Sequence, residues 1–274
     1  MAKAVQAVRT HELGMKEVWD REAVSSDDLL RIARSFHEDT PPFVRGLLSE
    51  FEDDLARFCF EGFSGSVLDA GCGTGEILTH ALRLYPELNI SYMGLDFSEN
   101  ILRRASGRGE LKSKASFFQG SVANLPYRDE TFDRVICSGV VWYLGSKCEV
   151  VRLLREFNRV LKPGGVLVTD CLNRLAPSII VVSLLARSRT RAPKYVSPFW
   201  FIKETKRAGF KVESYRGFNF SLFSGYRYLL MGRWKVFDPW FIQERWSRFV
   251  EKDIVPNVDK ISLFGHRLCV KCVK

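Results

Sequence analysis

The fold is decided by residues 67–75, Val67 to Gly75 (VLDAGCGTG), where an apolar run enters a loop with a glycine at every second position. A helical pattern follows over residues 75–84. Glycine accepts positive φ and places no side chain between the backbone and a ligand. A plain strand-to-helix turn would explain one glycine, but not three in five residues. The loop is therefore predicted to hold a ligand against backbone amides beside a helix N-terminus.

The glycine spacing and the acidic residue before it indicate the kind of ligand. Dinucleotide sites favour G-x-G-x-x-G, in which the loop receives a pyrophosphate. Here the pattern is G-x-G-x-G, and Asp69 stands just before it. A carboxylate is unfavourable beside a phosphate but favourable near an ammonium or sulfonium group. The pattern favours a cationic nucleoside without phosphates over a nicotinamide dinucleotide.

Short β-rich runs alternate with helical patterns from residue 63 onward. Strands are predicted at residues 66–70, 90–96, 116–118, 132–138, 165–171, 210–218 and 266–273, and helices at 75–84, 98–106 and 149–161. Nearly continuous apolar strands that alternate with helices indicate a doubly wound α/β fold with a parallel sheet. The segment Lys162-Pro163-Gly164-Gly165 is predicted to end a helix and to turn tightly into the next strand.

Asp96 closes the predicted strand 90–96, about 20 residues after the glycine loop. A carboxylate at this place in a nucleotide-binding fold can accept hydrogen bonds from both ribose hydroxyls. An aspartate at a strand end can also simply cap the next helix, here the one predicted over residues 98–106. Together with the glycine loop, the ribose interpretation is the stronger one.

Four runs carry a resemblance to a known family: VLDAGCGTGE, GLDFSENIL, FFQGSVANLPYRDETFDRVICSGVVWYL and LLREFNRVLKPGGVLVTD. They resemble the class I S-adenosylmethionine-dependent methyltransferases, and more narrowly the branch that methylates small molecules and quinone-type substrates. The resemblance covers residues 63–171, about 40% of the chain. It implies a seven-stranded, mostly parallel sheet with an antiparallel last strand. It also implies S-adenosylmethionine as methyl donor and S-adenosylhomocysteine as product. Methyl transfer from a sulfonium requires no metal, and the sequence has no cluster of His, Asp and Glu that would bind one.

The resemblance also implies a donor site at matching positions. Asp69, Gly71, Cys72, Gly73 and Gly75 would hold the methionine end, Asp96 the ribose, Phe97, Ser121 and Val122 the adenine, and Ser138 the methionine side. The chain departs from the family pattern at two places. Ser121 stands where an aspartate is usual, so a hydrogen bond to the adenine is weakened or passes through water. Trp142-Tyr143 stands where many relatives carry a histidine.

Two residues are candidates for the catalytic role that an oxygen nucleophile would need. His37 lies in the N-terminal segment where a lid would cover the cofactor, and Tyr143 lies near the position of the missing histidine. The alternatives are a solvated turn residue for His37 and core packing for Trp142 and Tyr143. Trp19 and Phe36 are further lid candidates.

Three parts of the chain are predicted. Residues 1–62 form an N-terminal helical lid, residues 63–218 with 263–274 form the donor-binding core, and residues 219–262 are an insertion that covers the acceptor site. Residues 195–246 hold 16 of the chain's 35 aromatic residues, which indicates either the wall of an apolar pocket or a satellite core or dimer interface.

Composition and charge narrow the range of expected binding partners. Residues 172–274 carry 20 basic and 7 acidic side chains, a net of +13, which suits an anionic substrate, a lipid headgroup or RNA, or an acidic part of the same fold. We expect a small apolar or anionic acceptor, no nucleic acid, no transmembrane segment and, at most, peripheral membrane contact. Seven scattered cysteines favour the cytoplasm. The alternatives are a nucleic-acid methyltransferase, an NAD(P)-dependent oxidoreductase, and a catalytically silent binding protein.

Overall fold

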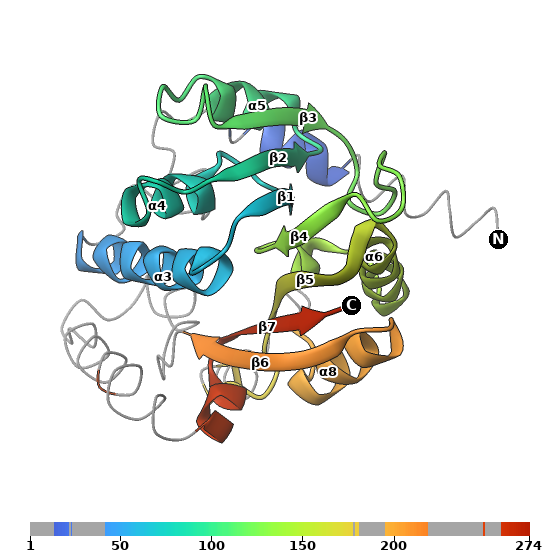
Figure 1. Ribbon diagram of the computed structural model, residues 1–274. Coiled ribbons are helices and arrows are strands. Elements are labelled where there is room, and N and C mark those ends of the chain that lie inside the picture. Colours follow the sequence, from blue (N-terminus) through green and yellow to red (C-terminus); the bar gives the residue numbers. More distant parts are fainter. Residues whose placement is uncertain are drawn as a thin grey trace. The chain divides into compact units, whose positions relative to one another are not determined.

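The computed structural model describes residues 14–21, 23, 42–177, 179–180, 195–218, 249 and 259–274 (Figure 1). Its strands are β1 (Gly65–Ala70), β2 (Ile90–Asp96), β3 (Ala115–Gln119), β4 (Phe132–Cys137), β5 (Leu161–Leu172), β6 (Lys211–Phe218) and β7 (Arg267–Val273). Its helices are α3 (Pro42–Phe60), α4 (Glu76–Leu84), α5 (Glu99–Ser106), α6 (Lys147–Val160) and α8 (Pro198–Arg207), with 3-10 turns η1 (Val141–Tyr143) and η4 (Asp259–Phe264). A further helical segment covers residues 14–21.

Seven strands form one sheet in the order β3-β2-β1-β4-β5-β7-β6. The pairs β1–β2, β1–β4 and β2–β3 are parallel. The strand β7 runs antiparallel to β5, because Lys274 exchanges hydrogen bonds with Gly164 and Gly165 while Asn173 N donates to His266 O at the other end. The predicted doubly wound, mostly parallel sheet with an antiparallel last strand is confirmed.

The helices around β1 are amphipathic, and their apolar faces form the core. Leu78 and Ala81 of α4 and Leu153 of α6 are fully buried, as are Val67 and Leu68 of β1. The crossovers β1-α4-β2 and β4-α6-β5 leave the centre of the sheet in opposite directions. Right-handed crossovers therefore place α4 and α6 on opposite faces. Figure 1 shows α4 and α6 on either side of the strands.

The chain divides into two compact units. The first contains residues 1–138, 143–168 and 273–274, and the second contains residues 139–142 and 169–272. Strands β1 to β4 with α3 to α6 belong to the first unit, and α8, β6 and η4 belong to the second. The predicted boundaries of the lid, the core and the insertion stay predictions.

One local prediction was wrong. The segment 162–165 is not a turn between a helix and a strand, because β5 already begins at Leu161. Gly164 has a φ of 75°, and the backbone hydrogen bonds with Lys274 keep this stretch in the sheet. Pro42 is the first residue of α3, where proline lacks only an N–H that the first turn leaves unpaired.

Candidate functional site

The loop between β1 and α4 turns at three glycines with positive φ, which are Gly71 (85°), Gly73 (54°) and Gly75 (78°). The Gly71 N–H donates to Leu95 O over 2.7 Å, which ties the loop to the end of β2. A Cβ at Gly75 would lie 2.6 Å from the Leu111 side chain, whereas a Cβ at Gly73 would meet no atom within 4 Å. Packing therefore requires Gly75, while Gly73 leaves its backbone open to a ligand.

Asp96 closes β2 and joins the glycine loop to the start of α5. Its Oδ2 accepts from Gly73 N over 3.1 Å, and its Oδ1 accepts from Ser98 N over 3.0 Å. The Asp96 side chain is only 5% exposed. Burial raises the pKa of Asp96 to about 6, although the backbone donors lower it. Phe97 N is a third backbone donor to this carboxylate, which has about four lone-pair sites and can therefore still accept from a ligand hydroxyl.

Asp69 is a second buried carboxylate at this edge. The Tyr92 hydroxyl donates to its Oδ2, and burial raises the pKa of Asp69 to about 7. Cys72 is buried beside the two carboxylates, and burial raises the pKa of its thiol well above the usual value. Sequence reasoning missed Tyr92. The strand register could have found it, because Tyr92 pairs with Val67, which shares a face of β1 with Asp69.

The remaining predicted donor residues follow the other strands. Phe97 comes after β2, Ser121 and Val122 come after β3, and Ser138 comes after β4; all four are half-buried. Ser121 Oγ accepts from Ala123 N over 3.1 Å, so this hydroxyl helps to form its own turn. Because the strands are parallel neighbours, the structure brings these residues to the same sheet edge as the glycine loop.

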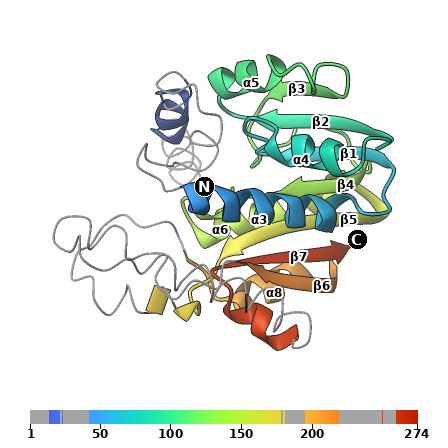
Figure 2. The same cartoon turned by 90° about the vertical axis from the view of Figure 1, so that its left-hand side faces the viewer.

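The helical segment 14–21 packs beside α5 within the first unit (Figure 2). Trp19 contacts Tyr143 edge-to-face, with ring centroids 5.5 Å apart. Ser98 Oγ donates to Asp20 Oδ1 over 2.5 Å, two residues beyond Asp96. Ala23 is buried against Ile101 of α5. An aromatic pair and an N-terminal helix therefore lie near Asp96, whereas His37 and Phe36 lie outside the described residues.

A buried ion pair organises the second unit. Asp170, at the end of β5, accepts from Arg267 Nε over 2.6 Å and from Gly139 N over 3.0 Å. The Arg267 guanidinium lies 5.0 Å from the centroid of the Trp142 ring. Asp170 thus holds the segment 139–142, which directly follows Ser138. Sequence reasoning missed this pair, although an aspartate ending an apolar strand signals a buried charge that needs a partner.

The contacts and burial of two histidines indicate structural rather than catalytic roles. His80 Nδ1 lies 2.6 Å from Asp53 Oδ1, and burial lowers the pKa of His266 to about 4, which keeps it neutral. Among the described residues, no group of three or more His, Cys, Asp or Glu side chains could hold a metal ion. In the same part of the chain, no helix is both long and apolar enough to cross a bilayer.

The donor residues fit S-adenosylmethionine. This molecule carries a ribose diol and a net positive charge, and it lacks phosphates. Asp96 offers acceptors for the diol, Gly73 offers open backbone, and two buried carboxylates with raised pKa values would both be stabilised in their charged forms by a cation. A pyrophosphate would instead meet these two carboxylates at short range.

Comparison with known proteins gives a match to the family described as a methyltransferase domain over residues 68–169. The Mus musculus protein named "Probable tRNA methyltransferase 9B" is 31% identical over 150 residues, which cover 54% of this chain and 31% of that protein. Demethylmenaquinone methyltransferase from Shouchella clausii is 39% identical over 124 residues, which cover 44% of this chain and 49% of that protein. The chain thus spans about a third to a half of the length of these relatives.

A solved structure agrees with the fold. Magnesium protoporphyrin IX methyltransferase from Synechocystis PCC 6803, determined with bound S-adenosylhomocysteine, superposes with a TM-score of 0.60 at 14% identity. The superposition covers 89% of this chain and 93% of that one. Residues 68–169 match the methyltransferase-domain family, and the chain shares the Rossmann-like fold of this solved S-adenosylhomocysteine-bound structure.

Proposed function

We propose that this protein transfers a methyl group from S-adenosylmethionine to an oxygen or nitrogen atom of a small apolar or aromatic molecule. One observation carries the proposal. The bond from Gly73 N to Asp96 Oδ2 fixes an open glycine loop against a buried carboxylate at the end of the neighbouring strand. This arrangement suits a nucleoside whose ribose meets Asp96 while its charged end lies along the loop.

We assign the donor contacts by position along the four strand ends. Asp69, Gly71, Cys72, Gly73 and Gly75 face the methionine end, Asp96 the ribose, Phe97, Ser121 and Val122 the adenine, and Ser138 the methionine side. Tyr92 acts through Asp69, because its hydroxyl orients the Asp69 carboxylate and favours the ionised form of that carboxylate. The charge on Asp69 then complements the cationic end of the donor.

The bound donor supplies a methyl group on a sulfonium sulfur, so the protein mainly has to align the acceptor and exclude water. We assign the exclusion of water to the segment 14–23, which is fixed on α5 by Asp20 and Ala23. Tyr143, in contact with Trp19, is placed on the acceptor side, where its hydroxyl can position an acceptor oxygen. His37 stays a candidate base within the proposed lid over residues 1–62.

The small apolar acceptor is supported by the demethylmenaquinone methyltransferase relatives and by the aromatic-rich stretch 195–246, which overlaps the proposed insertion 219–262. The second candidate is a nucleic-acid acceptor. It is supported by the relative named as a tRNA methyltransferase and by the 20 basic against 7 acidic side chains of residues 172–274. A cytoplasmic location is supported by seven scattered cysteines that form no disulfide with one another.

Two measurements test the proposal. Calorimetry with S-adenosylmethionine and S-adenosylhomocysteine should show binding, and NADH should not bind. Transfer of label from the donor should then occur to a reduced naphthoquinone, a phenol or an aromatic amine. Binding of NADH with no response to the methyl donor would refute the donor assignment. Labelling of tRNA with none of the small molecules labelled would refute the acceptor assignment and leave the donor assignment intact.

A further inference from the structure

We propose that one face of α8 is a docking surface for a membrane that contains anionic lipids. The face consists of Phe199, Ile202, Lys203, Lys206 and Arg207, and is called the α8 face below. It belongs entirely to the second unit and contains none of the donor residues. The inference does not depend on which molecule is methylated.

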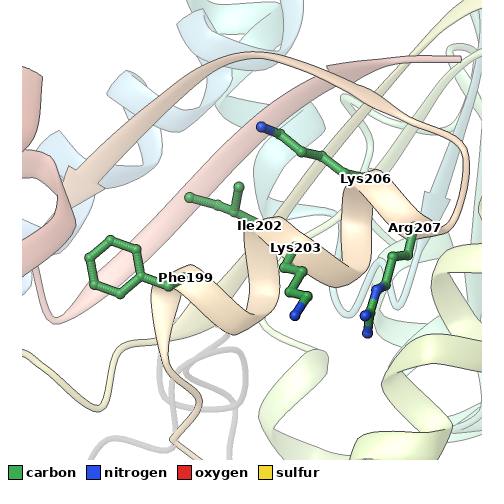
Figure 3. Close-up of a pocket in the computed structure, with 5 residues that line it drawn as sticks. All are labelled: Phe199, Ile202, Lys203, Lys206 and Arg207. Atoms are coloured by element: carbon green, nitrogen blue, oxygen red, sulfur yellow. The ribbon is translucent and has the colours of Figure 1, made fainter.

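The helical repeat gathers these residues on one side of α8. Positions 199, 202, 203, 206 and 207 follow the spacing of three and four residues that defines one face of a helix. They line a shallow hollow of about 490 Å³, and Figure 3 shows Phe199 at the first turn and Lys206 and Arg207 at the last. Phe201 and Thr205 lie on the opposite side and are fully buried. The inward side therefore fixes the helix, and the α8 face is left to solvent.

The α8 face carries cationic charge that the described part of the chain does not neutralise. Lys203 and Lys206 are exposed, and neither forms an ion pair with any described residue. Arg207 pairs with Glu204 over 2.8 Å, but its side chain is still 63% exposed. In the sequence, Arg187, Arg189, Arg191 and Lys194 come shortly before the helix. The exposed cations of the α8 face complement a surface of anionic headgroups.

The apolar members of the face select a membrane over other polyanions. Phe199 is 61% exposed, the most exposed of the large apolar side chains that the structure describes, and Ile202 lies beside it. An apolar tip next to lysine and arginine is typical of elements that lie at a lipid–water interface. Of the groups that read base edges in nucleic acids, the face has only lysine and arginine, and it lacks the amide, hydroxyl and carboxylate groups that read adenine and cytosine. It also offers no hydrogen-bond acceptor for the amide groups of a peptide partner.

Sedimentation of the full chain with vesicles tests the proposal. The probes are phosphatidylcholine vesicles with and without about 30% phosphatidylglycerol. The wild type should bind only the anionic vesicles, and added salt should weaken this binding. The variant Lys203→Ala/Lys206→Ala should bind about 25-fold less tightly, from about fivefold for each cation removed near the surface. Phe199→Ala should lose about fivefold to tenfold, because the ring no longer enters the interface.

A matched variant controls for total charge. Lys112 and Lys114 are exposed in the loop before β3, and Lys112→Ala/Lys114→Ala removes the same charge from the first unit. It should bind vesicles almost as the wild type does. Binding of S-adenosylhomocysteine by every variant, measured by calorimetry, shows that the fold is intact, and its failure in the wild type would count against the methyl-transfer proposal only.

Three results would overturn the docking proposal. The first is equal binding to neutral and anionic vesicles, or to neither. The second is an equal loss in the α8 variant and the control variant, because the effect would then come from total charge. The third is binding of a single-stranded RNA oligonucleotide that depends on Lys203, Lys206 and Phe199 and that anionic vesicles do not displace. That result would assign the α8 face to nucleic acid.

Discussion

Replacing Asp96 by asparagine should weaken donor binding and, at neutral pH, leave the ligand-free fold at least as stable as the wild type. Asparagine keeps the volume of the side chain and one acceptor oxygen. It loses the negative charge and the second acceptor, which the ribose would use. Hydrogen bonds to a charged group contribute about 1.5–3 kcal/mol each. We therefore expect the donor Kd to rise by roughly 10- to 150-fold.

Whereas donor affinity should fall, the stability of the ligand-free fold should rise, because burial disfavours the ionised form of Asp96 that is present at neutral pH. Its pKa is about 6 in the fold, against 3.8 for an aspartate exposed to water in the unfolded chain. This difference corresponds to roughly 3 kcal/mol. Because the folded pKa is the higher one, the stabilising contribution is fully present below pH 3.8 and is lost as the pH rises through 6. Asparagine stays neutral and avoids this cost of up to about 3 kcal/mol at pH 7. Its amide nitrogen faces one of the two backbone donors, Gly73 N or Ser98 N, and the lost hydrogen bond returns about 1–3 kcal/mol of that gain.

Urea unfolding of the ligand-free protein at pH 5 and pH 7 measures the stability, and calorimetry with S-adenosylhomocysteine measures the affinity. The wild type should lose stability from pH 5 to pH 7 relative to Asp96→Asn. Asp129→Asn is a suitable control, because its carboxylate is largely exposed in the pair with Arg159. A variant that binds the product normally and unfolds more easily would show that Asp96 only caps the start of α5, and would refute the ribose assignment.

Three further substitutions test other parts of the site. Tyr92→Phe removes the hydroxyl that favours ionised Asp69, so donor affinity should fall at pH 7 and recover partly at pH 8.5, as calorimetry across this range would reveal. Gly73→Ala should strongly lower donor affinity and should cost about 1 kcal/mol of stability. Gly75→Ala should lower the melting temperature further, because its Cβ meets a side chain at 2.6 Å. Equal effects of the two substitutions on affinity and melting temperature would contradict the open loop. Asp170→Asn leaves a buried arginine without its counter-charge and should cost about 3–5 kcal/mol in urea unfolding.

The sequence predicted the strands well because each is a continuous apolar run between turn residues. The predicted strand 90–96 matches β2 at both ends, and 132–138 exceeds β4 by one residue. Errors arose where distant parts of the chain decide local structure. Gly164 and Gly165 form a turn in isolation, but Lys274 pairs with them and keeps them in β5. No short stretch of sequence contains that contact.

The residues of the candidate site also fall into two groups, those signalled by local sequence and those that depend on distant contacts. The glycine loop and Asp96 are local signals, and the structure brings them together through one hydrogen bond. Tyr92 and Arg267 matter through partners 23 and 97 positions away, Asp69 and Asp170. Only the register of the strands or the three-dimensional structure can reveal such partners. The burial of Asp96 was also missed, because this part of the chain contacts residues that are distant in the sequence, as the bond from Ser98 Oγ to Asp20 Oδ1 shows.

The two buried carboxylates have a consequence for the heat of binding. With pKa values of about 7 and about 6, Asp69 and Asp96 carry a fraction of a proton between them at neutral pH. A cation that binds beside them displaces this proton into the buffer. The observed enthalpy of donor binding should therefore vary with the ionisation enthalpy of the buffer. The demethylated product has one positive charge fewer, so it should release fewer protons, and each turnover would carry a small proton cycle in these two side chains.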